Sequence, residues 1–293
     1  MQSCLLSVFN INFRMKPIKQ LLTLFTLTML AACQTNTDTT SKPAENKIIE
    51  VQPNFKSIIN GSWVRRVYID NLKKTKSPAK SENNVNSFVE LYIDASKIKG
   101  DSLEIGAATF HEGGGFHIFL RAGIAPNSFP TNMIDYDNKS NFYELGYSIS
   151  TKDTSMVIYH YDKNKKLIEQ SEYQKAPLRT EEALQYMVNK TLVAGKYKMT
   201  DTTGKSRTIQ LTNDGKIIGL PGFTTYYINT DFVEGPEDSL DFIFLNFRIK
   251  NQKWYTYEIK GDTINLYEVI KTKSEDEEIS SLGQLKYKLI KHD

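Results

Sequence analysis

Apolar residues recur at every second position in many short runs of this chain, and this period limits its fold more than any other feature. Runs such as Val89, Leu91, Ile93 and Tyr255, Tyr257, Ile259 would place apolar side chains on one face of an extended strand. Further strands are predicted at 63–69, 116–120, 156–161, 209–211, 217 onward, 243–249, 264–266 and 285–289. Turn-forming residues separate the runs, at 99–101, 162–164, 213–215 and 260–262, and a long loop is predicted at 123–140. The pattern predicts an all-β fold of antiparallel hairpins.

One segment departs from this pattern, from Thr180 to about Lys190. Leu184, Met187 and Val188 share a stripe at helical spacing, and Thr180 is suited to cap the helix at its N-terminus. The segment follows Ala176-Pro177, where a chain element is expected to end. We interpret it as a helical junction between two β domains.

The stretches on either side of this helix follow similar plans. One opens with Gly61-Ser62-Trp63 and the other with Gly195-Lys196-Tyr197. Each also contains an aromatic-rich hairpin, FYELGYSISTKDTSMVIYHY from residue 142 and KWYTYEIKGDTINLYEV from residue 253. The segments IKGDSL, from Ile98, and IKGDTI, from Ile259, are alike as well. Such recurrence predicts two copies of one domain.

The motif Gly61-x-Trp63 at the start of a strand resembles the signature of lipocalins and their bacterial lipocalin-like relatives. The resemblance implies an up-and-down antiparallel barrel with the tryptophan plugging its closed end. The family also has an arginine from the last strand packed over this tryptophan, whereas the second copy ends in Lys286-Tyr287-Lys288. The fold expected is therefore two tandem antiparallel lipocalin-like β-barrels joined by a short helix, an arrangement that removes exposed strand edges.

A different pattern marks the N-terminus, from Met15 to Cys33. Lys16 and Lys19 precede an apolar run, and the run ends in small residues before a cysteine. This is the layout of a secretory signal. Met15 is a second candidate for the start of translation.

The residues Leu30-Ala31-Ala32-Cys33 resemble the lipobox of bacterial lipoproteins, which implies acylation of Cys33 and cleavage before it. The competing interpretation is an uncleaved membrane anchor, which needs about 20 apolar residues. The run from Leu21 to Ala32 is shorter and contains three threonines. Gln34 stands where enteric lipoproteins of the inner membrane carry aspartate, so the resemblance favours the outer membrane of the cell envelope.

These observations divide the chain into five parts. They are a signal peptide at 1–32, a lipidated flexible tether at 33–54, a first β domain at 55–176, the junction at 177–191 and a second β domain at 192–293. The tether is rich in Thr, Asn, Pro and charge and has little to bury. Cleavage would remove 32 of the 293 residues and leave 261, enough for two domains.

Charge and cysteine content exclude some functions. The removed segment contains Arg14, Lys16 and Lys19, which leaves 34 basic and 34 acidic residues. A neutral chain lacks the basic excess that nucleic-acid binding requires, so no nucleic-acid partner is expected. Of the two cysteines, Cys4 precedes the cleavage site and Cys33 carries the lipid, so the fold depends on an apolar core without disulfides.

The densest group of potential metal ligands is His111, Glu112 and His117, in the segment FHEGGGFH. Histidine and carboxylate side chains are zinc ligands. The three glycines are equally suited to a plain hairpin with surface histidines, and the spacing is not that of a helical H-E-x-x-H site. We assign no metal and no cofactor, and His160 is interpreted as a hydrogen-bonded residue of a barrel wall rather than a catalytic base. The acidic run from Glu275 to Glu278 is interpreted as a solvated turn.

Three functions remain open. The first is a non-enzymatic, lipid-anchored envelope protein that binds a small apolar ligand or an envelope partner at a barrel mouth. The second is an interaction module whose barrels are solid and which presents loops such as 123–140. The third is a metal-dependent hydrolase using His111, Glu112 or His117. The aromatic pairs Tyr226-Tyr227 and Trp254-Tyr255 either line a pocket for an apolar or sugar ligand or belong to the core.

Overall fold

The computed structural model describes residues 54–82, 85, 87–151, 153–177, 182–232, 240–273 and 278–292. The predicted signal peptide, Cys33, the tether up to residue 53, the capping Thr180 and most of the acidic run at 275–278 lie outside the described residues. All described helices and strands belong to one unit, residues 46–293. A chain that starts at residue 46 therefore keeps every described contact and is expected to fold by itself.

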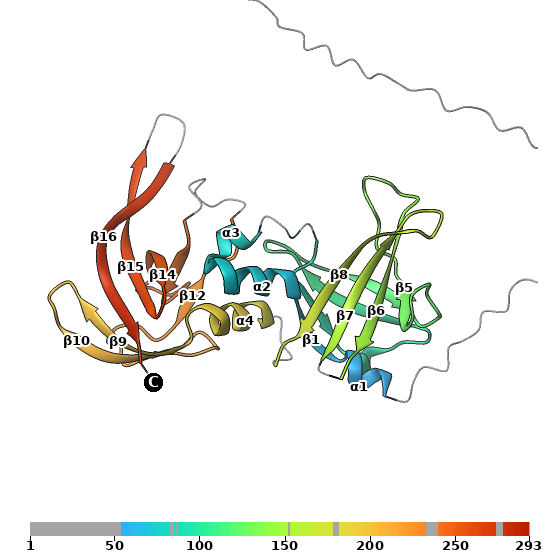
Figure 1. The fold of residues 1–293 in the computed structure, drawn as a ribbon, viewed down its shortest axis with the longest axis horizontal. Coiled ribbons are helices and arrows are strands. Elements are labelled where there is room, and N and C mark those ends of the chain that lie inside the picture. Colours follow the sequence, from blue (N-terminus) through green and yellow to red (C-terminus); the bar gives the residue numbers. More distant parts are fainter. Residues whose placement is uncertain are drawn as a thin grey trace, which may run out of the picture. The chain divides into compact units, whose positions relative to one another are not determined.

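The first half of the described chain contains an eight-stranded antiparallel sheet with the spatial order β4-β3-β2-β1-β8-β7-β6-β5 (Figure 1). Each strand thus lies beside its neighbours in the chain, and the first strand pairs with the last. The strands are β1 (Gly61–Arg65), β2 (Glu90–Ile93), β3 (Ser102–Ala108), β4 (Gly113–Phe119), β5 (Ser128–Pro130), β6 (Phe142–Ile149), β7 (Thr154–Tyr161) and β8 (Leu167–Lys175).

The second half has the same up-and-down connections, with the order β11-β10-β9-β16-β15-β14-β13-β12, but its edge strands are its third and fourth rather than its fourth and fifth. Its strands are β9 (Gly195–Asp201), β10 (Ser206–Leu211), β11 (Ile217–Ile218), β12 (Tyr226–Ile228), β13 (Phe242–Leu245), β14 (Lys253–Lys260), β15 (Thr263–Lys273) and β16 (Glu278–Lys291). The two aromatic-rich hairpins predicted to correspond, β6–β7 and β14–β15, are the sixth and seventh strands of their sheets. The IKGD segments do not correspond, because one precedes a third strand and the other joins a sixth to a seventh.

Both sheets close on themselves. In the first, Ile118 bridges Thr131, and the N–H of Asn132 donates to the carbonyl of His117 at 3.1 Å. In the second, Lys216 bridges Thr225. These contacts bring the edge strands of each up-and-down sheet together and give it a barrel-like form. The predicted all-β fold of two tandem antiparallel barrels is confirmed.

The aromatic residue of each G-x-aromatic motif closes one end of its barrel. The Nε1 atom of Trp63 donates to the carbonyl of Ile59 at 2.8 Å, and the hydroxyl of Tyr197 donates to the carbonyl of Val193 at 2.6 Å. Both acceptors lie four residues earlier, at or just after the end of a helix, α1 (Phe55–Ile59) or α4 (Ala183–Leu192). Each barrel is therefore plugged by the helix and the aromatic side chain that precede and begin its first strand.

A lysine occupies the place for which the lipocalin resemblance implies an arginine. Lys175, in the last strand of the first barrel, pairs with Trp63, and its Nζ atom lies 5.1 Å from the ring centroid. Lys291 pairs with Tyr197 in the same way in the second barrel. A Cβ atom on Gly195 would lie 3.1 Å from Cε of Lys291, so the glycine leaves room for the lysine stem. In the second barrel the last-strand residue that pairs with the aromatic residue is therefore Lys291, and not a residue of the segment 286–288.

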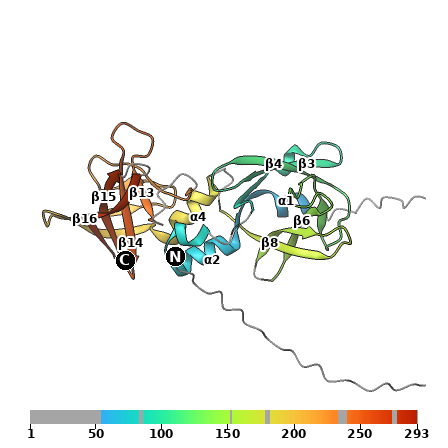
Figure 2. The same cartoon turned by 90° about the horizontal axis from the view of Figure 1, so that it is seen from above.

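The prediction of a strand at 63–69 is wrong beyond Arg65. A helix, α2 (Arg66–Thr75), follows β1 directly, and a short helix, α3 (Pro78–Glu82), follows α2. Tyr68, Ile69 and Leu72 are fully buried and share one face of α2. In Figure 1 and Figure 2, α2 lies beside α4, against which it packs. The helical spacing was not recognised in the sequence because the residues from Trp63 to Ile69 also alternate with the period of a strand.

Two further predictions need correction. The strand expected at 243–249 ends at Leu245, because Asn246 and Arg248 adopt left-handed conformations with φ of 55° and 61°. The loop expected at 123–140 contains the short strand β5. A short helical turn, η1 (Ala95–Lys97), follows β2. The turn at Gly261-Asp262 between β14 and β15 is confirmed.

The helix α4 begins three residues later than predicted, at Ala183. Glu90 on β2 supplies its cap: the N–H groups of Ala183 and Leu184 donate to the two carboxylate oxygens of Glu90, each at 3.1 Å. Negative charge at a helix N-terminus satisfies free N–H groups and interacts favourably with the helix dipole. The first barrel thus fixes the start of the helix that leads into the second. Met187 and Val188 are buried, as the helical stripe predicted.

Candidate functional site

Apolar side chains are buried inside both barrels. In the first, Trp63, Leu91, Ile105, Leu145 and Tyr173 are fully buried in one apolar cluster. In the second, the interior cavity found is about 10 Å³ and is lined by apolar side chains, among them those of Leu211, Ile264 and Leu266. That volume is about the space of one water molecule, whereas ligand pockets measure about 300–1,000 Å³.

Helices cover the second barrel at the end that carries Tyr197. Tyr68, Ile69 and Leu72 of α2 belong to the same buried cluster as Val188 of α4 and the interior residues of β9–β16. The N–H of Ala79 in α3 donates to Oδ1 of Asp241 at 3.0 Å, next to the start of β13. An insertion between the first two strands of the first barrel is therefore part of the core of the second.

Of the three candidate metal ligands, the structure separates His117 from His111 and Glu112. His111 and Glu112 lie in the turn between β3 and β4, and His117 lies on β4 opposite Glu104. The Nδ1 atom of His111 is 2.6 Å from Oδ1 of Asp231, in the second half of the chain. Within the described part of the chain, no group of three His, Cys, Asp or Glu side chains is placed to hold a metal ion.

The turn that contains His111 lies near two carboxylates, those of Glu82 and Asp231. Burial raises the pKa of Glu82, at the end of α3, and Asp231 adds to the rise, while His111 opposes it. These three side chains thus influence one another electrostatically, although they come from three distant segments. Sequence spacing gave no signal of this group, since His111 and Asp231 are 120 positions apart.

His160 is hydrogen-bonded on the barrel wall, as predicted. Its Nε2 atom lies 2.9 Å from Oδ2 of Asp135, and its ring stacks on Tyr143 at a centroid distance of 4.3 Å. Asp135 also accepts hydrogen bonds from the side chain of Asn141 and from the backbone N–H groups of Asp137 and Asn138. Four donors hold this carboxylate, so it orders the loop between β5 and β6.

We expect the Asp135 network to make stability depend on pH. The hydrogen bond from Asn141, followed by that from Asn138, lowers the pKa of Asp135 below its ordinary value of 3.8. A lowered folded-state pKa stabilises the protein above the unfolded-state pKa, and this contribution is lost as the pH falls through the folded-state pKa. Between pH 5 and pH 2, the wild type should therefore lose more stability than Asp135→Asn. Asp137→Asn, at an exposed neighbour, is the control and should follow the wild type; parallel curves for all three chains would contradict the expectation.

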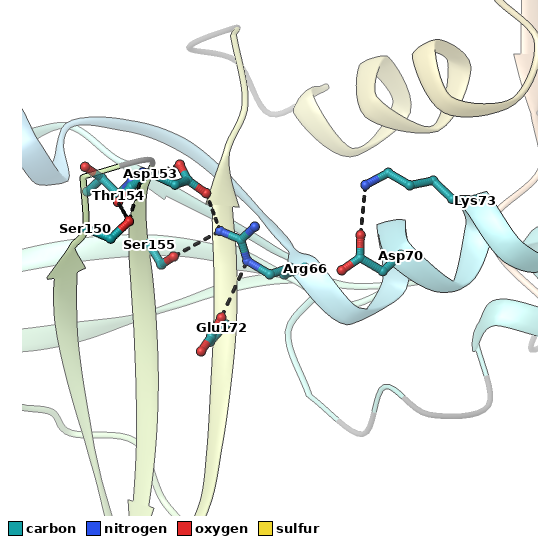
Figure 3. Close-up of polar contacts among 8 residues, drawn as sticks. All are labelled: Arg66, Asp70, Lys73, Ser150, Asp153, Thr154, Ser155 and Glu172. Carbon is teal, nitrogen blue, oxygen red and sulfur yellow. Dashed lines mark hydrogen bonds and ion pairs between the residues drawn. The ribbon is translucent and has the colours of Figure 1, made fainter.

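A second polar network fixes the start of α2 (Figure 3). The Nη2 atom of Arg66 donates to Oδ2 of Asp153 at 2.6 Å and to Oγ of Ser155 at 3.0 Å, and Nε lies 3.5 Å from Oε2 of Glu172. The Arg66 hydrogen bond lowers the pKa of Asp153. Ser150 completes the group by accepting the N–H of Asp153 at 3.0 Å. The guanidinium is thus engaged by two carboxylates, and we interpret the network as an anchor of α2 to β7 and β8.

The outer face of β2, β3 and β4 is hollowed. Two adjoining hollows of about 250 and 650 Å³ share Tyr92 and Gly106 as lining residues. The larger one is also lined by Lys97, Glu104 and His117, side chains of mixed charge. His117 therefore lies on this outer face, and the mixture of charges selects no single class of ligand.

The aromatic pairs of the second half divide between the two faces of the sheet. Tyr226 and Tyr255 are buried inside the barrel, whereas Tyr227 and Trp254 lie on its outer face and are partly exposed. Alternation predicts this division once the strands are known, but sequence alone did not show which member of each pair faces outward.

No family model matches the chain, and the comparisons with curated proteins and with solved structures find no similar protein. Among the described residues, no helix has the length and apolar character needed to cross a membrane.

Proposed function

We propose that the protein is a non-enzymatic, lipid-anchored module of the cell envelope, whose solid barrels act as scaffolds and whose partners bind on the outside. The apolar core of the second barrel carries this proposal, because its interior cavity of about 10 Å³ leaves no room for a lipid or another apolar ligand of ordinary size. The first barrel contains a comparable cluster of fully buried apolar side chains. The proposal favours the interaction module over the carrier. Anchoring through Cys33 and the preference for the outer membrane rest on the lipobox resemblance.

Native mass spectrometry of residues 46–293 tests the solid-barrel part. We expect the native mass to equal that of the chain, and a mass excess that disappears on denaturation would establish a carried ligand instead. Leu266→Ala is the matched control, since it removes a buried side chain from the cavity wall and enlarges the cavity. This variant should bind benzene in titrations in which the wild type shows no binding. The mass of the mature chain extracted from membranes tests the lipid on Cys33 separately.

A further inference from the structure

The hairpin that joins β13 to β14 is basic and contains no acidic residue. From Phe242 to Tyr257 the chain has Arg248, Lys250 and Lys253 and neither Asp nor Glu. The three bases are exposed, and so is Ile249, with 52% of its surface accessible. We call residues 246–253 the basic hairpin. In a chain whose mature part is formally neutral, this is a local excess of positive charge beside an exposed apolar residue.

An aromatic surface adjoins the basic hairpin. Tyr227, Phe244 and Trp254 face one another in register across β12, β13 and β14. All three are partly exposed on the outer face, and Phe247 of the hairpin stacks on Tyr227 at 4.6 Å. The planes of Phe244 and Trp254 are within 5° of parallel. We call Tyr227, Phe244, Phe247 and Trp254 the aromatic face.

Two cations lie over these rings. The Nζ atom of Lys271 is 4.7 Å from the ring centroid of Trp254, and the guanidinium carbon of Arg248 is 5.0 Å from that of Phe247. Amphipathic side chains of this kind keep their stems on an apolar surface and their charges toward water or phosphate. The surface therefore combines apolar rings with a rim of positive charge.

The geometry of the basic hairpin is fixed by hydrogen bonds. Asn246 is 3% exposed and adopts φ of 55°. Its side chain accepts the N–H of Thr224 at 2.9 Å and donates to the carbonyl of Gly222 at 2.8 Å. The N–H of Arg248 donates to Oε1 of Gln252 at 2.7 Å. Arg248 and Ile249 are therefore presented by an ordered turn.

We propose that the aromatic face and the basic hairpin dock on an anionic lipid surface. Charge complementarity carries the choice, because phosphate headgroups attract the bases while half-buried aromatic rings and an exposed isoleucine favour the boundary between headgroups and acyl chains. A neutral soluble saccharide would make no use of the bases, and a second copy would bring bases against bases. The inference extends the proposed function, in which the lipid on Cys33 holds the chain near such a surface, but the docking itself needs no lipid anchor.

Tryptophan fluorescence offers a direct test, because the chain has two tryptophans and one of them, Trp63, is fully buried. Residues 46–293, without any lipid, are mixed with vesicles of phosphatidylcholine alone or with added phosphatidylglycerol, and with the same lipids brominated on their acyl chains. We expect binding to the anionic vesicles that weakens with salt, and quenching of Trp254 by the brominated lipid. Trp254→Phe should abolish the quenching. Residues 46–293 do not include Cys33, so a failure to bind vesicles would not bear on the proposed lipid anchor. Conversely, a mature chain without lipid on Cys33 would not bear on vesicle binding by residues 46–293.

Matched variants distinguish docking through the aromatic face and the basic hairpin from nonspecific binding to lipid. Lys250→Gln with Lys253→Gln should weaken binding about 25-fold, at about fivefold per base, whereas Lys163→Gln with Lys166→Gln, in the exposed turn between β7 and β8, should leave binding unchanged. Ile249→Ser should weaken binding and Ile149→Ser, at an isoleucine that is 55% exposed in the first barrel, should not. The proposal would be overturned if the two members of each pair had equal effects. It would also be overturned by vesicle binding without quenching of Trp254, or by no binding. A fluorescence response to soluble saccharides or to protein concentration without any response to vesicles would overturn it as well.

Discussion

An alanine in place of Trp63 is expected to lower the free energy of unfolding by about 3–5 kcal/mol. The side chain is fully buried, and its removal would leave a large cavity at the closed end of the first barrel. It would also remove the hydrogen bond to the carbonyl of Ile59 and leave that acceptor without this donor. Urea unfolding of residues 46–293, followed by far-ultraviolet circular dichroism, measures the change.

Trp254→Ala is the control for this prediction. The same residue type is removed, but Trp254 is partly exposed and its contacts are cross-strand ring pairs, so the expected cost is about 1 kcal/mol. Similar losses for the two variants would mean that Trp63 does not plug the barrel. A third variant, Trp63→Phe, keeps most of the volume and should fall between them.

The sequence predicted the strands that are long and flanked by clear turns. Tyr255, Tyr257 and Ile259 alternate within β14, and Gly261 has φ of 58° in the turn that follows, so local preference and final structure agree there. The G-x-aromatic motifs also marked the first strand of each barrel. These features depend on residues that are close together in the sequence, so a single sequence is enough to predict them.

The helix α2 was missed because tertiary contacts decide its structure. The segment from Trp63 to Ile69 alternates well enough for a strand, and the helical stripe appears only when Leu72 is included. Tyr68, Ile69 and Leu72 find their partners in α4 and in the second barrel, more than a hundred residues later. A segment with two acceptable periods adopts the one that buries more apolar surface, and a single sequence does not show where that surface is.

The candidate sites were less predictable than the fold. The segment from His111 to His117 looked like one cluster in sequence, but the turn and strand of the β3–β4 hairpin direct its members to different surroundings. Trp254 lies within a 16-residue stretch, 242–257, that has three bases and no acid, and this local excess of positive charge is a signal that the sequence does contain. The register of Tyr227 and Trp254 across three strands required the sheet topology.

Tyr68→Ala is expected to destabilise the second barrel although Tyr68 belongs to the first half of the chain. The side chain is fully buried in the core that α2 shares with β9–β16, and its ring contacts Phe110 at a centroid distance of 4.9 Å. Loss of a buried aromatic of this size costs about 3–5 kcal/mol. Hydrogen exchange of the backbone amides should therefore accelerate most in β9–β16. Phe55→Ala is the matched control, since Phe55 is equally buried but packs only in the first core, and it should accelerate exchange in β1–β8.

The hydroxyl group of Tyr68 allows a second, milder variant. It is buried, and among the described atoms it has no hydrogen-bond partner. Burial, aided by the carboxylates of Glu82 and Asp241, raises the pKa of Tyr68, so the phenol is neutral near neutral pH. Tyr68→Phe removes an unsatisfied polar atom and keeps the ring, so it should leave stability unchanged or raise it slightly. If Tyr68→Phe were as harmful as Tyr68→Ala, or if Tyr68→Ala accelerated exchange only in β1–β8, then α2 would not couple the two barrels.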